Sequence, residues 1–276
     1  MSPRALLLVL SLTLSPSFGD TAEIELGEGA TLFIPRGYQP REGKVDVALH
    51  LHGAASVVEP ALAELDWPAV LIVFNRSGLS SAYAKPFSDP ALFPRLLDKA
   101  IKALSDRYPG ESLEVGEVLV SSFSAGFGGV REILKDPASF DRIDSLVLAD
   151  SLYCGYSSNP ADKRLDPDLM RDFERFAREA AAGRKRLLVT HSAQVPEGYG
   201  STTETADSLI AVTGAAIEPT DVDWGDGWRQ TRRAFKGRFE VLGFAGEGAT
   251  DHLRHLKRIA ELWKRVPEPF GEAPKP

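Results

Sequence analysis

The sequence lacks several features that would point to specialised architectures. Cys154 is its only cysteine, so no disulfide can form within the chain and stability must come from the core. It has no internal repeats and no low-complexity linker, and α/β folds of about 250 residues commonly form a single domain. Positive charge is in deficit, with 32 Lys and Arg against 39 Asp and Glu. The net charge of −7 argues against nucleic acid or an anionic membrane surface as the main partner.

Long hydrophobic runs are also missing, and the longest, residues 5–14, is too short to span a bilayer. It follows a short basic start, and Ser17 and Gly19 stand three and one residues before a possible cut ahead of Asp20. We therefore expect residues 1–19 to be a signal peptide, and the mature protein to be secreted or periplasmic with no membrane span. The alternative is that this run forms an apolar first helix of the fold.

What the chain does contain is an alternation of apolar, β-like runs with helical patterns. The expected strands are residues 22–26, 31–35, 45–51, 69–74, 117–120, 146–149, 187–190 and 239–244, the first two forming a hairpin. The expected helices are residues 90–108, 125–134, 167–182, 201–212 and 251–266. Such alternation predicts an α/β fold with a mostly parallel central sheet and helices on both faces. The spacing of Ser201 and Glu204 fits a capping box at a helix start.

Two long stretches between strands, residues 151–185 and 193–237, could shape a binding site, but neither is large enough to form a cap domain. The second carries the aromatic residues Tyr199, Trp224 and Trp228, so we expect an open pocket bordered by them. We expect one domain over residues 20–266, followed by a mobile proline-rich tail over residues 267–276.

Ser124 stands between an apolar strand-like run and a helical pattern that starts with small residues. Ser122 and Gly126, two before and two after it, lack bulk, as a tight strand-to-helix turn requires. The arrangement resembles the nucleophile elbow of the α/β-hydrolases. Glycine is usual where Ser122 stands, which is a mild departure. The resemblance predicts that Ser124 is a nucleophile.

A serine hydroxyl is a weak nucleophile unless a base, normally a histidine held by a carboxylate, removes its proton. In α/β-hydrolases the chain order is nucleophile, acid, histidine. His252 follows the last expected strand and begins the final expected helix, where the stripe of Leu253 and Leu256 would turn it towards the sheet edge. We expect His252 to be the base; His255, one turn along, is the alternative, and a solvent-facing role for His252 is another.

The acid is expected to be Asp150, which ends the strand beside the Ser124 strand, on the edge where α/β sheets form their sites. Most α/β-hydrolases carry the acid one strand later, after the run that here ends in His191. The first carboxylate beyond that point is Glu197, which is the alternative acid.

Taken together, the chain is similar to α/β-hydrolases of the esterase/lipase type over nearly all of its mature length. The resemblance implies an oxyanion loop at the strand end around Gly53, with the amides of Ala54 and Ala125 as donors. Gly53, His191 and Tyr153 are the residues expected to contact substrate. We expect a serine hydrolase acting on small-molecule or polymeric esters, with no cofactor and no metal.

Three other functions fit the sequence. An amidase or acyltransferase would use the same triad, and a non-catalytic ligand-binding protein could share the fold. A metal hydrolase is the third, because His50 and His52 are two apart on a strand and could present two imidazoles to zinc. No Asp-His pair follows to extend that cluster.

Overall fold

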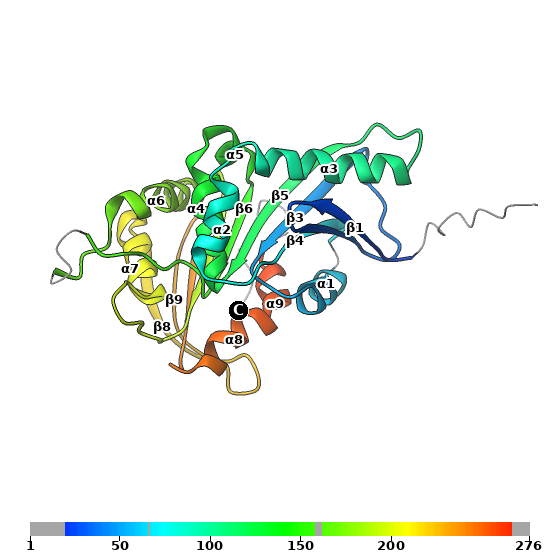
Figure 1. The fold of residues 1–276 in the computed structure, drawn as a ribbon. Coiled ribbons are helices and arrows are strands. Elements are labelled where there is room, and N and C mark those ends of the chain that lie inside the picture. The colour runs from blue at the N-terminus through cyan, green and yellow to red at the C-terminus, as the bar shows by residue number, and fades with distance from the viewer. Residues whose placement is uncertain (1–19, 66, 158–161, 267–276) are drawn as a thin grey trace, which may run out of the picture.

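The structure is a computed structural model that describes residues 20–65, 67–157 and 162–266. The expected signal peptide and proline-rich tail lie outside these residues. Within them the chain forms one ten-stranded sheet in the order β1-β2-β4-β3-β5-β6-β7-β10-β9-β8 (Figure 1). The strands are β1 Ala22–Gly27, β2 Ala30–Ile34, β3 Lys44–Leu51, β4 Ala69–Phe74, β5 Glu114–Phe123, β6 Ser145–Ala149, β7 Arg186–His191, β8 Ala216–Asp223, β9 Arg229–Lys236 and β10 Phe239–Phe244.

The middle of the sheet is parallel, as the sequence predicts. Every pair from β4 through β3, β5, β6 and β7 to β10 is parallel, while β1 and β2 at one edge and β9 and β8 at the other are antiparallel. Parallel strands end at the same edge, so the carboxyl ends of β5, β6 and β7 meet there. This edge positions the residues that follow those strands.

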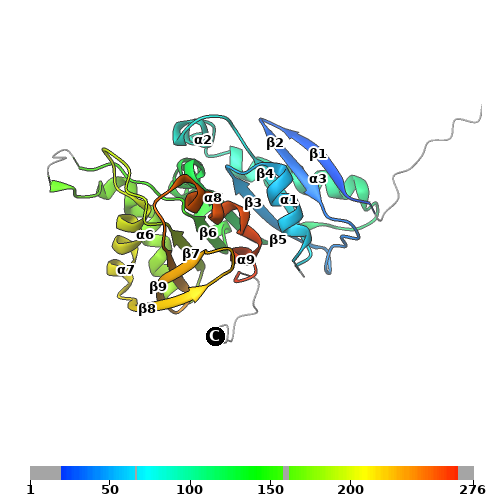
Figure 2. The same cartoon turned by 90° about the horizontal axis from the view of Figure 1, so that it is seen from below.

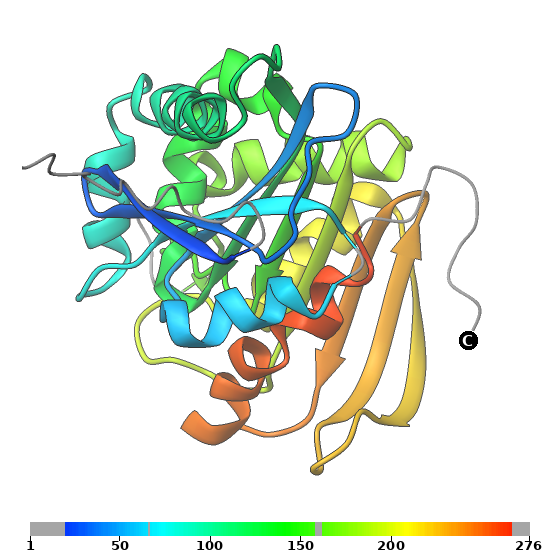
Figure 3. The same ribbon diagram turned by 90° about the vertical axis from the view of Figure 1, so that its right-hand side faces the viewer.

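Helices cover both faces of the sheet. On one face lie α2 Ser80–Phe87, α3 Leu92–Arg107, α4 Phe127–Lys135, α5 Pro137–Arg142, α6 Pro167–Ala181 and α7 Thr202–Thr213. On the other, α1 Ala55–Ala63 packs beside α8 Ala249–Lys257 and α9 Ile259–Trp263 (Figures 2 and 3). No separate cap domain stands over the sheet in the described ranges. None of the helices described is long and apolar enough to cross a bilayer.

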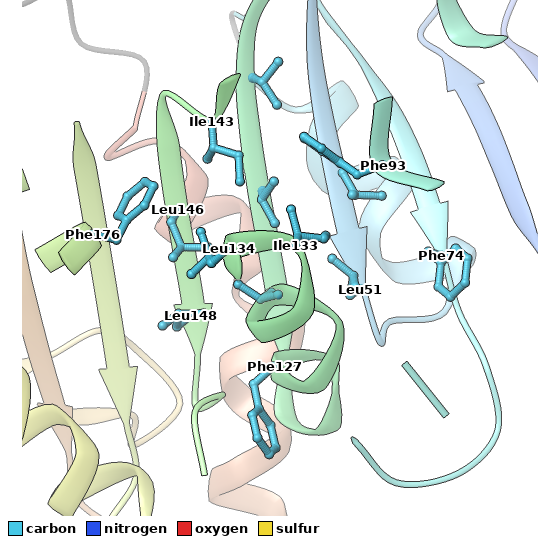
Figure 4. Packing of buried hydrophobic residues seen from close by; sticks show 14 of the residues in the cluster. Leu51, Phe74, Phe93, Phe127, Ile133, Leu134, Ile143, Leu146, Leu148 and Phe176 are labelled. Carbon is cyan, nitrogen blue, oxygen red and sulfur yellow. The ribbon is translucent and has the colours of Figure 1, made fainter. Parts of the chain in front are cut away.

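Alternating side chains of the buried strands divide the core into two layers. In β4, Val70, Ile72 and Phe74 belong to the cluster beneath α3 and α4, and the residues between them belong to the cluster beneath α1 and α9. Figure 4 shows the first layer, where Leu134 of α4 lies beside Leu146 of β6. Strands buried on both faces read as continuous apolar runs, which is why the sequence predicts them well.

The structure corrects part of the expectation for residues 193–237. Beyond α7 this stretch forms the β8–β9 hairpin, which extends the sheet (Figure 3). Trp228 is buried and stacks on Phe244, with Trp224 packed against both rings, so both tryptophans pack into the cluster beneath α1 and α9. Nearly all of β8 is exposed, so burial imposes no apolar pattern that would reveal a strand.

Two helix expectations also need correction. The final helix is divided at Arg258 into α8 and α9, and Leu253, expected on its apolar stripe, is exposed. The short helices α1, α2 and α5 were not expected from the sequence, and α1 and α2 each contain a proline. The capping box at the start of α7 is confirmed, with Ser201 and Glu204 each bonding the other's backbone amide.

Candidate active site

Ser124 lies on a tight turn between β5 and α4. It opens the short 3₁₀ segment η1 (Ser124–Gly126) with a φ of 45°, in the left-handed region that is strained for a residue with a side chain. A Cβ on Gly126 would clash with the carbonyl oxygen of Leu51, so the turn accepts only glycine there. Ser122 is buried, and its hydroxyl lies 2.8 Å from that of Ser151. The turn therefore has the geometry of a strained strand–elbow–helix.

His252 lies in the first turn of α8, with Nε2 2.8 Å from Oγ of Ser124. Phe123 packs against its imidazole, with ring centroids 4.6 Å apart. A histidine nitrogen at this distance is within reach of the hydroxyl proton. Here the structure brings together two residues that the sequence places in one site.

Asp150 completes the line of groups. It directly follows β6, and its Oδ2 lies 2.7 Å from Nδ1 of His252. Its Oδ1 accepts hydrogen bonds from the amide of Ser192 at 2.9 Å and the hydroxyl of Thr202 at 2.6 Å. Burial disfavours the ionised carboxylate and by itself would raise the pKa of Asp150. This effect is outweighed by the hydrogen bonds from His252 and Thr202 and by the nearby His255, so the pKa of Asp150 lies below its usual range. The group can therefore remain a carboxylate although it is fully buried.

The alternative residues occupy other places. His255 is buried beneath Trp228, its Nδ1 lies 2.7 Å from Oγ1 of Thr190, and its Nε2 lies 4.0 Å from Oδ2 of Asp150. Burial lowers its pKa to about 4, so it is neutral at pH 7. Glu197 is exposed, whereas the carboxylate bonded to His252 is that of Asp150.

A cavity of ≈ 460 Å³ opens beside Ser124 and His252. Tyr153 and Ala125, both predicted at the site, are among the residues that line it: Leu79, Ser80, Ser124, Ala125, Phe127, Arg131, Tyr153, Cys154, Gly155, Gln194, Tyr199 and His252. Gly53, Ala54 and His191 are not part of this lining. Phe127 and Arg131 were not predicted at the site, although their spacing of four residues within the expected helix 125–134 places both on one helical face.

Gly53 and His191, which were expected to contact substrate, do not line this cavity. Both are packed against other residues of the protein instead. A Cβ on Gly53 would lie 2.7 Å from Nε2 of His50, so glycine is needed for close packing. His191 is buried, its Nε2 accepts a hydrogen bond from Nε of Arg232 at 2.8 Å, and its Nδ1 lies 3.0 Å from Oγ1 of Thr203. Both ring nitrogens of His191 are therefore occupied within the protein.

The two histidines of the metal hypothesis have separate partners. Nδ1 of His50 lies 3.1 Å from Oγ of Ser121, and its ring packs edge-on against Trp263. Nδ1 of His52 lies 2.7 Å from the hydroxyl of Tyr83, against the opposite face of the sheet. Across the described part of the chain, no group of three or more His, Cys, Asp or Glu side chains is arranged to hold a metal ion.

Ser124, Asp150 and His252 follow one another in the chain order of nucleophile, acid and histidine. The mostly parallel sheet is covered on both faces, and the elbow serine lies at the carboxyl end of a central strand. The chain has the α/β-hydrolase fold.

Comparisons with known proteins add little to this assignment. No family model matches the sequence, and no curated protein matches it. Similar solved structures include a mutant feruloyl esterase module from Clostridium thermocellum complexed with sinapinate, at 12% identity and a TM-score of 0.47, covering 89% of each chain. An S-formylglutathione hydrolase from Staphylococcus aureus has 14% identity and a TM-score of 0.45 over 90% of this chain and 98% of that one. A carboxylesterase from Bacillus subtilis has 10% identity and a TM-score of 0.43, over 91% and 90% of the two chains. The fold assignment rests on the topology and the elbow.

Proposed function

We propose that this protein is a serine hydrolase that cleaves carboxylic esters through an acyl-enzyme on Ser124. The hydroxyl of Ser124 attacks the ester carbonyl while Nε2 of His252 takes its proton, and Asp150 stabilises the imidazolium that forms. The proton then passes to the departing alcohol as the tetrahedral intermediate collapses. Water, activated by the same histidine, attacks the acyl-enzyme and releases the acid with free Ser124.

The observation that carries the proposal is the continuous chain of contacts from Ser124 through His252 to Asp150. Its two distances, 2.8 Å and 2.7 Å, lie within the range for transfer of a proton and for orientation of the imidazole. The three groups come from the ends of β5 and β6 and from the first turn of α8. A ligand-binding protein would have no need to align a strained serine, an imidazole and a buried carboxylate.

We assign the oxyanion to the amides of Ala125 and Ala54. Ala125 lies in the first turn after the elbow, where backbone N–H groups have no acceptor within the helix, and it lines the cavity. Ala54 precedes α1 and is exposed. Loss of one such donor typically costs roughly 3 kcal/mol of transition-state stabilisation.

Turnover of matched p-nitrophenyl esters and p-nitroanilides tests the reaction class. An ester hydrolase releases p-nitrophenol from the esters, with an initial burst that matches the enzyme concentration if deacylation is slow. Faster cleavage of the anilides would assign an amidase. Acyl transfer to an added alcohol in preference to water would assign a transferase. A folded protein that turns over none of these would be assigned to the ligand-binding alternative.

We also propose that the enzyme acts outside the cytoplasm after removal of residues 1–19. The support is the basic start, short apolar run and small residues of that segment. Amino-terminal sequencing of protein recovered from the medium or periplasm would begin at Asp20. Recovery of the full-length chain from the cytoplasm alone would contradict this.

A further inference from the structure

Among the described residues that line the cavity, Arg131 is the only one with a permanent charge. It lies on α4, seven residues after Ser124, with Phe127 between them in the chain. Phe127 is four residues before Arg131 on the same face of α4, and the guanidinium carbon of Arg131 is 5.7 Å from its ring centroid. The cavity lining therefore includes a nucleophile, an aromatic ring and a cation that packs on that ring.

The guanidinium of Arg131 has little compensation from other side chains. Its Nε is buried and has no hydrogen-bond partner among the described residues. The nearest carboxylate oxygen, on Glu132, lies 3.6 Å from that nitrogen, and both oxygens of Glu132 accept hydrogen bonds from Lys135 at 2.8 Å and 2.7 Å. Burial raises the pKa of the neighbouring Cys154 to about 11, so its thiol adds no negative charge at pH 7.

We propose that Arg131 determines specificity for an ester that carries a carboxylate remote from its ester bond. A guanidinium binds a carboxylate through two parallel hydrogen bonds, and it does so most strongly where water is partly excluded. The side chain of Arg131 is only 18% exposed, and the other residues of the described chain that line the cavity are His252 and uncharged groups. This assignment rests on the proposed ester hydrolysis at Ser124.

The aromatic residues of the cavity indicate the chemistry of the spacer that joins the ester and the carboxylate of the substrate. Tyr153 packs against Phe127 with ring centroids 5.8 Å apart, and Tyr199 packs against Tyr153 at 5.7 Å. All three line the same cavity as Ser124 and Arg131. An apolar or aromatic spacer would contact these rings while the ester lies at Ser124 and the carboxylate at Arg131.

Two matched substrate pairs test this specificity and show which half of the ester carries the charge. In the acyl pair, p-nitrophenyl hydrogen adipate is compared with the ester in which a carboxamide replaces the free carboxylate. In the alcohol pair, 3-(4-acetoxyphenyl)propionate is compared with its carboxamide. The readout is the ratio of kcat/KM for the charged and neutral members. In the wild-type protein we expect a preference of roughly 10- to 100-fold for the charged member of at least one pair.

Arg131→Gln should bring that ratio close to one, and Arg131→Lys should retain part of the preference. Lys102→Gln, which removes an exposed positive charge on α3, should leave the ratio unchanged. A ratio near one for both pairs in the wild-type protein, or a preference that survives Arg131→Gln, would overturn the proposal. If Arg131→Gln lowers kcat/KM equally for the charged and neutral members, Arg131 only supports the position of Phe127. That result would also overturn the proposal.

A binding measurement distinguishes a failure of this proposal from a failure of the proposed ester hydrolysis. The same pairs can be titrated calorimetrically into the Ser124→Ala protein, with and without Arg131→Gln. Tighter binding of a charged member that depends on Arg131 supports anion recognition even if the wild-type protein turns over no ester. Equal affinity for charged and neutral members counts against it, whatever the catalytic result.

Discussion

Asp150 and His252 lie 102 residues apart in the chain, yet Oδ2 of the first is 2.7 Å from Nδ1 of the second. Because Nδ1 faces the carboxylate, it carries the proton in the neutral ring, and Nε2 presents its lone pair to Ser124. The second oxygen of Asp150 is fixed by Ser192 and Thr202, so the carboxylate cannot rotate without losing hydrogen bonds. The orientation of the base thus depends on residues from three separate segments.

Replacement of Asp150 by asparagine tests this relationship. The amide can present a hydrogen-bond donor to Nδ1, which favours the wrong tautomer and removes the negative charge opposite the imidazolium. We expect kcat for an ester to fall by about 10⁴-fold, as in other triads. Glu197→Gln, a change to an exposed carboxylate, is the matched control and should leave kcat unchanged. The reverse pattern would transfer the role of acid to Glu197.

A methyl group added at the elbow tests the geometry of the turn. Gly126→Ala places a Cβ against the carbonyl oxygen of Leu51, and backbone cannot move aside as a flexible side chain can. Overpacking of this kind typically costs about 1–3 kcal/mol in the free energy of unfolding, which urea denaturation would measure. Gly155→Ala is the control, because its Cβ would meet only Leu169 at 3.5 Å, an ordinary contact. Equal stability of the two variants would show that the turn is looser than described.

The buried strands and the local motifs could be predicted from the sequence because each depends on neighbouring residues. All six residues of β4 are buried, and their apolar run is recognisable without tertiary information. Ser124, Asp150 and His252 each follow or begin a recognisable element. The roles of Thr202 and Arg131 could not be predicted in this way. Thr202 contacts Asp150 only after the chain between them has folded. Arg131 stands out only once the cavity has formed, because the other described residues that line it carry no permanent charge.

Burial also explains why His191, predicted to contact substrate, is not among the residues that line the cavity beside Ser124. A histidine at the end of a strand near the site edge can point into the cavity or into the core, and the sequence does not distinguish these. Here the partner that holds the ring is Arg232 on β9, a strand whose pattern is too polar to be recognised. The β8–β9 hairpin was missed for the same reason.

The buried histidines predict acid sensitivity. Burial, together with the charge of Arg232, lowers the pKa of His191 to about 4, and burial lowers that of His255 to about 4. In the unfolded chain both accept a proton near pH 6.5, as an exposed histidine does. Between about pH 6.5 and 4 the unfolded state therefore binds more protons, and the free energy of unfolding falls as the pH falls.

Chemical denaturation at several pH values between 7 and 4.5 measures this dependence. His191→Gln keeps an acceptor for Arg232 and cannot be protonated. Its free energy of unfolding should decline less steeply than that of the wild-type protein, by up to about 1.4 kcal/mol per pH unit. Parallel curves for the two proteins would mean that His191 is protonated as readily in the fold as outside it.

The most direct test of the central claim is labelling of the purified protein with a fluorophosphonate, followed by mapping of the modified peptide by mass spectrometry. Such reagents react with a serine whose hydroxyl is activated by a base, so the account predicts one label, on Ser124, in the wild-type protein. Ser124→Ala should take up none while it retains the wild-type circular dichroism spectrum. A folded wild-type protein that remains unlabelled, or that is labelled on a different serine, would contradict the assignment of Ser124 as an activated nucleophile.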